Sequence, residues 1–111
     1  MTEEERKERI HGFKQAVNMT ARQLGTWLET KESGKVGWKE GDRGESVGHR
    51  SGRSILRILR RKAHEYTTAD LTHMAKVSAF VKRHLAQRPS GDVSETPWRY
   101  SLMNWGHDPT K

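Results

Sequence analysis

The chain has 111 residues, a formal net charge of +7 at pH 7 and a hydrophobic fraction of 32%. This length suits one domain and is too short for two of ordinary size. The absence of cysteine excludes disulfides and thiolate metal ligands. No apolar run approaches the roughly 18 residues of a membrane span, and residues 1–9 lack the apolar core of a secretory signal, so we expect a cytoplasmic protein with no membrane partner.

The spacing of the apolar residues predicts an all-α fold. We expect one compact domain over residues 1–111, a bundle of four main helices plus a short C-terminal helix. The first helix is expected over residues 2–17, where three early glutamates suit the positive end of the helix dipole. Because its first two turns are almost entirely charged, we expect residues 1–9 to fray.

Capping residues mark where two further helices begin. Thr20 and Gln23 have the spacing of a capping box, which predicts the start of the second helix. Thr96 followed by Pro97 has the pattern of an N-cap with proline in the first helical position. Gly106 is expected to end that short C-terminal helix, whose two tryptophans we expect to dock on the core.

Residues 33–52 contain six glycines among charged residues and little that a core would bury. This composition predicts a long glycine-rich loop between the second and third helices. Trp38, which lies between Lys35 and Lys39, is a candidate for stacking on a nucleobase. The commoner role of a tryptophan in such a loop is to anchor the loop to the core.

The third helix, entered through Ser51 or Gly52, carries the most informative charge pattern. Residues 50–62 hold six basic residues and no acidic one, so this block supplies almost the whole net charge. In a helix, its isoleucines and leucines fall on one arc and its arginines on the opposite arc. The arginines of this face are Arg50, Arg53, Arg57, Arg60 and Arg61.

The fourth helix is expected to start at Thr67 or Thr68 and to stop at Arg88, before Pro89. Residues 71–91 contain four basic residues, including Lys76, and no acidic one, so this helix can extend the basic surface. The residues assigned to that extension are Lys82, Arg83 and Arg88.

Other chemistries lack a positive signal. The six histidines do not have the spacing of a zinc site, and no nucleophilic triad stands out, so we expect no metal, no cofactor and no enzymatic activity. Residues 48–54 lack the spacing of a nucleotide-binding P-loop, but a simple anion cradle stays open. The candidate cradle residues are Gly48, His49, Ser51, Gly52 and Ser54.

Several long segments together resemble the uncharacterised family called domain of unknown function 3140. The resemblance implies that the glycine-containing segment and the C-terminal tryptophans belong to the domain proper. Members of the family are sometimes labelled DNA-binding. The segments are 18–20 (Asn-Met-Thr) with 27–30 (Trp-Leu-Glu-Thr), 45–53 (Glu-Ser-Val-Gly-His-Arg-Ser-Gly-Arg), 84–92 (His-Leu-Ala-Gln-Arg-Pro-Ser-Gly-Asp) and 98–109 (Trp-Arg-Tyr-Ser-Leu-Met-Asn-Trp-Gly-His-Asp-Pro).

The arginine face favours a polyanionic partner, and we expect sequence-tolerant binding of double-stranded DNA through phosphates. Two alternatives stay open. One is a protein-interaction module that docks an acidic partner or self-associates through the acidic residues 3–8. The other is an enzyme acting on a phosphorylated small molecule, with His49 as its base.

Overall fold

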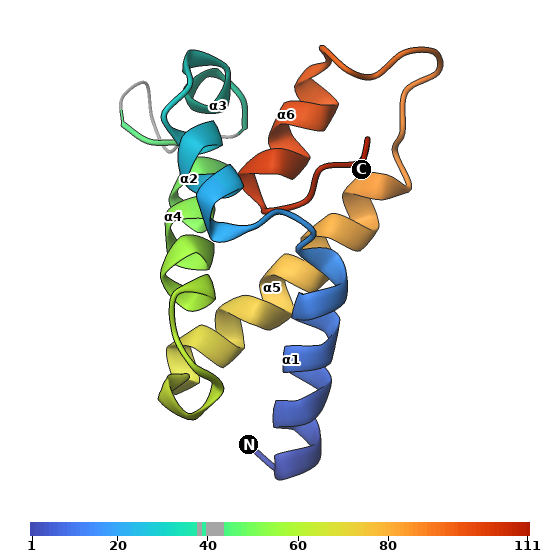
Figure 1. Cartoon of the computed structure of the whole chain (residues 1–111). Helices are drawn as coiled ribbons and strands as arrows, with labels where there is room; N and C mark the ends of the chain where they lie inside the picture. The colour runs from blue at the N-terminus through green and yellow to red at the C-terminus, as the bar shows by residue number, and fades with distance from the viewer. Residues whose placement is uncertain (38, 40–43) are drawn as a thin grey trace.

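The computed structural model describes residues 1–37, 39 and 44–111, and this part of the chain is helical without any strand. The predicted all-α class is confirmed, but six α-helices form where five were expected (Figure 1). They are α1 (Glu3–Ala16), α2 (Ala21–Leu28), α3 (Lys31–Lys35), α4 (Val47–Leu59), α5 (Thr68–Leu85) and α6 (Pro97–Asn104), with a 3₁₀ turn, η1 (Ala63–Glu65), between α4 and α5.

Three of the six described helices begin at capping side chains that the sequence predicted. The Thr20 hydroxyl accepts from the Gln23 backbone N–H at 3.1 Å, and the Gln23 side chain accepts from the Thr20 N–H at 3.0 Å, which completes the capping box. Thr67 begins α5 in the same way, and Thr96 caps α6 ahead of Pro97. Gly106, at φ +81°, ends α6 in the left-handed conformation that glycine tolerates.

The predicted loop over residues 33–52 is wrong at both ends. Its first residues lie in α3, and its last six form the first half of α4, which starts at the Ser46 cap and not at Ser51 or Gly52. The Ser46 hydroxyl accepts from the His49 backbone N–H at 3.0 Å. The stacking role suggested for Trp38 falls outside the described residues.

The glycines of α4 allow close helix packing. A Cβ on Gly52 would lie 2.6 Å from the Asn104 carbonyl oxygen and 2.6 Å from a Leu28 methyl carbon. A Cβ on Gly48 would lie 3.2 Å from the Trp105 indole nitrogen. Therefore α4 approaches α2 and α6 more closely than any side chain at position 52 would permit.

α4 and α5 meet near the turn that joins them and diverge from there, and α6 lies between their far ends (Figure 1). α1 packs along α5. The core between these helices is closed by Leu24, Ile55, Met74, Val77 and Leu102, each 0% exposed.

Asn104, at the end of α6, connects three helices from a fully buried position. Its Oδ1 accepts from the Trp27 indole N–H at 2.8 Å and from the Ser33 hydroxyl at 2.5 Å. Its amide donates to the Ser33 carbonyl at 3.0 Å. Because Asn104 and Ser33 are fully buried and their polar atoms are paired, these hydrogen bonds fix α2 and the short α3 against α6.

Aromatic rings from α5 and α6 interleave into one stack. Phe80 is at its centre, with the Trp105 ring at 4.2 Å and the His84 ring at 5.0 Å between centroids. Burial lowers the pKa of His84, so the ring is neutral at pH 7. The stack runs through His73, Trp105, Phe80, His84 and Trp98 and ends under the guanidinium of Arg88.

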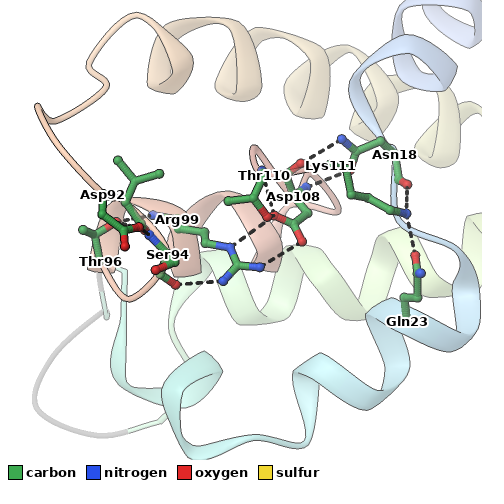
Figure 2. A network of polar contacts seen from close by, with 10 residues as sticks. Asn18, Gln23, Asp92, Ser94, Thr96, Arg99, Asp108, Thr110 and Lys111 are labelled. Atoms are coloured by element: carbon green, nitrogen blue, oxygen red, sulfur yellow. Dashed lines mark hydrogen bonds and ion pairs between the residues drawn. The ribbon is translucent and has the colours of Figure 1, made fainter.

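The C-terminal residues are clamped by a polar network around Asp108 (Figure 2). Arg99 donates to both carboxylate oxygens of Asp108, at 3.2 and 3.1 Å. Asn18 exchanges two hydrogen bonds with the Asp108 backbone, at 2.9 and 2.7 Å. The predicted docking of the C-terminus is confirmed, since Trp98 and Trp105 are each only 8% exposed.

The close contact at Gly52 predicts a specific stability pattern. Gly52→Ala should destabilise the protein by about 2 kcal/mol or more, because its methyl group meets backbone that has no free space to move. The control is Gly34→Ala in α3, where nothing lies within 4 Å, and which should stabilise by up to about 1 kcal/mol through helix propensity. Urea unfolding gives the change in the free energy of unfolding for each variant. Equal changes in the two variants would contradict the close packing at Gly52.

A second prediction concerns the stability of the fold at low pH. Burial raises the pKa of Asp108, but hydrogen bonds from Arg99 and Thr110 outweigh it and lower this pKa to about 2. The folded value is therefore below the unfolded one of about 3.9, so the stabilisation is present above pH about 4 and is lost as pH falls toward 2.

Because the ion pair of Arg99 with Asp108 is partly exposed, we expect this stabilisation to be about 1 to 2 kcal/mol. Asp108→Asn should lose it at neutral pH and should approach the parent in stability near pH 2. Urea unfolding across this pH range checks the sign, with Glu95→Gln as the control for an exposed carboxylate of the same region. A constant difference between parent and Asp108→Asn at all pH values would contradict it.

Candidate nucleic-acid interface

Helix α4 has a buried face and, on the opposite side, a basic face. Ile55 and Ile58 are 0% and 1% exposed, and the small residues Gly48, Ser51 and Gly52 complete the buried side. The opposite side carries the predicted arginines. Of these, Arg50, Arg53, Arg57 and Arg60 are exposed and Arg61 is half-buried.

Arg53 has an acidic partner within its own segment. Its guanidinium donates to Glu45 at 2.5 Å, and the other oxygen of this carboxylate contacts the ring of His49. Burial raises the pKa of Glu45, but the hydrogen bonds from Arg53 and His49 outweigh it and lower the pKa below its ordinary value. The charge of Arg53 is thus largely compensated before any partner binds.

Arg61 is engaged in the fold. It forms an ion pair with Asp70, whose carboxylate also accepts from the Thr67 backbone N–H at 3.0 Å as part of the α5 capping box. Burial raises the pKa of Asp70, but hydrogen bonds from Thr67 and Arg61 outweigh it and lower the pKa. Arg61 therefore joins the end of α4 to the start of α5.

Three arginines of α4 have no carboxylate partner in the part of the chain that the structure describes. They are Arg50, Arg57 and Arg60. Arg57 donates to the Ser54 hydroxyl at 3.1 Å, a neutral contact that orients the guanidinium without neutralising it. These three carry the uncompensated positive charge of the helix.

The basic residues predicted on α5 do not share one surface. Arg83 lines a groove together with the start of α4, whereas Lys82 lies over the contact with α1, next to Glu8 and Arg9. Arg88 lies 5.4 Å from the centre of the Trp98 ring, where it closes the aromatic stack.

Lys76 joins Arg83 on the groove side of α5, and it was not among the assigned binding residues. Its spacing of seven residues from Arg83, two helical turns, is the sequence signal that places both on one face. Burial lowers the pKa of His73, and the positive charges of Lys76 and Arg57 lower it further. Arg57 of α4 and Lys76 of α5 thus act on the same ring, and the negative charge of Asp70 opposes them.

The five candidate cradle residues lie inside α4 and not in a loop ahead of it. His49 contacts the Leu28 carbonyl oxygen at 2.8 Å as well as Glu45, and Ser51 is hydrogen-bonded to His73 at 2.8 Å. Gly48 and Gly52 are covered by neighbouring helices. Ser54, next to Arg57, is the member that lies on the basic side.

The described histidine, aspartate and glutamate side chains form no cluster that could hold a metal ion. None of the helices in the described ranges is long and apolar enough to cross a membrane. What the arrangement offers chemically is a set of fixed positive charges, which suits the binding of anions.

Comparison with known proteins gives one match. A family model described as "Protein of unknown function (DUF3140)" matches residues 12–103, which include the end of α1, the whole of α2 to α5 and most of α6. No curated protein and no solved structure matches the chain.

Proposed function

The chain belongs to the DUF3140 family, whose function is unknown, and we propose that this member binds double-stranded DNA through phosphate contacts with little sequence preference. The observation that carries the proposal is the set of three exposed arginines on α4, Arg50, Arg57 and Arg60, without carboxylate partners in the described residues. Uncompensated arginines on a helix are costly to the fold, since like charges one turn apart repel.

The spacing of these arginines fits a duplex. Arg50 and Arg60 are ten residues apart, which is about 15 Å along an α-helix and about four base pairs of DNA. The basic face of α4 carries no asparagine or glutamine, the residues that read adenine edges. Phosphate contacts and low sequence specificity follow from this composition.

Lys76 and Arg83 extend the proposed surface from α4 to α5. Both are exposed and line the same groove, and the charge of Lys76 acts together with that of Arg57 on the ring of His73. Two changes from the sequence-based set follow. Lys76 joins the proposed contacts, and four residues leave them. Arg53 and Arg61 leave because each is paired with a carboxylate, Lys82 because it lies next to α1, and Arg88 because it lies on the Trp98 ring.

Five phosphate contacts predict that log K for duplex DNA falls with log salt concentration at a slope of about −4 to −5. Replacing Arg50, Arg57 and Arg60 by glutamine should reduce the slope to about −2 and weaken binding to any duplex sequence by a similar factor. A fluorescence anisotropy titration over a salt series measures both quantities.

The control variant removes the same charge elsewhere, from the exposed Lys14, Arg22 and Lys31, and should bind nearly as the parent does. Equal losses in the two triple variants would mean that only net charge matters, which contradicts the proposed surface. Binding of polyglutamate as tight as that of DNA would instead favour an acidic protein partner.

A further inference from the structure

A groove of about 600 Å³ lies between the start of α4, the middle of α5 and α6. This volume is within the range of pockets that hold small molecules, roughly 300 to 1,000 Å³. Its described lining includes no acidic residue. Among the residues that line it are Val47 from α4, Lys76, Phe80 and Arg83 from α5, and Trp105, which directly follows α6.

On the α5 side of this groove an aromatic ring lies between two basic side chains. Lys76, Phe80 and Arg83 are spaced i, i+4 and i+7, so they share one face of the helix, with a cation about one turn away on either side of the ring. Both cations are exposed. An anionic group lying over Phe80 is therefore within reach of two long basic side chains.

Two rings stack on Phe80. Trp105 lies at 4.2 Å between centroids with an interplanar angle of 11°, and His84 lies at 5.0 Å and 18°. These parallel neighbours restrict the ring face that is left for a ligand, so the proposed contact is with the ring edge. The edge of an aromatic ring carries partial positive charge, which adds to the attraction for an anion.

Val47 provides an apolar surface at the opposite rim. It is the first residue of α4, and its side chain is 38% exposed, one of only three large apolar residues so exposed in the described part of the chain. Nothing in the helix requires an apolar residue at this position, because the cap is made by Ser46. A ligand body lying in the groove would cover it.

We propose that this groove binds a small aromatic carboxylate. The ring system of the ligand would lie against Val47 and the edges of Phe80 and Trp105. Its carboxylate would pair with Lys76 and Arg83. This site is separate from the duplex contacts of α4, although Lys76 and Arg83 belong to both surfaces.

The test uses 1-naphthoate as the probe and 1-naphthamide as its neutral counterpart, in calorimetric titrations at low ionic strength. Naphthoate should bind at one site, and the amide should bind at least about tenfold more weakly because it lacks the charge-assisted contacts. Saturable binding of both probes with equal affinity, or no saturable binding of naphthoate, would overturn the proposal.

Two neighbouring substitutions locate the site. Arg83→Gln should weaken naphthoate binding by about fivefold, whereas Lys82→Gln removes the same charge on the α1 side and should change it by less than about twofold. Equal losses in the two variants would show a non-specific charge effect and reject the groove.

Val47→Asp is a second, independent variant that should still fold. An aspartate in the first turn of α4 favours the helix, but its charge would repel the carboxylate, so binding should fall about fivefold below that of the matched Val47→Asn. Equal binding by these two variants would contradict the proposed position of the ligand. Far-UV circular dichroism confirms that each variant is folded.

The probe also separates this inference from DNA binding. The variant with glutamine at Arg50, Arg57 and Arg60 should keep its naphthoate affinity within about twofold if the groove acts alone. Loss of naphthoate binding in that variant would show that the carboxylate of the probe binds to α4. It would reject the proposed groove site and would leave the DNA proposal unaffected.

Discussion

The contact between Gly52 and the Asn104 carbonyl determines how α4 is oriented. A side chain at position 52 would overlap both that oxygen and Leu28, so the helix can lie this close only because the residue is glycine. Once this face is buried with Ile55 and Ile58, the opposite arc, with its arginines, must face solvent. The direction of the positive charge is thus a consequence of packing on the other side of the helix.

Asn104 and the ring stack extend this constraint to the rest of the molecule. Asn104 pairs with Trp27 and Ser33, which holds α2 and α3 against the end of α6. The next residue, Trp105, stacks on Phe80 and so ties α6 to the middle of α5. The positions of α4 and α5 are therefore set by contacts in the core, and a groove forms between them in which α5 contributes Lys76 and Arg83 and α4 contributes Val47 and Gly48.

Local signals in the sequence predicted much of this fold, because caps and apolar periodicity act within one helical turn. Thr20 and Thr96 were predicted as caps and are caps, and of the two candidates Thr67 and Thr68 it is Thr67 that caps α5. The glycines of residues 33–52 led to the wrong prediction that this whole segment is a loop. A glycine in a flexible loop and a glycine at a close helix contact look alike in sequence, and only the partner surfaces on Leu28 and Asn104 distinguish them.

The candidate site was predictable in part. The arginine face of α4 follows from helical periodicity, but the ion pair of Arg61 with Asp70 and the separation of Lys82 from Arg83 depend on how helices pack. An amide nitrogen-proton NMR titration with a short DNA duplex tests whether the basic residues of α4 and α5 form the DNA-binding surface. Shifts concentrated at residues 50–60 and 76–83 are the predicted result, and shifts confined to α1, or spread evenly over all basic residues, would contradict it.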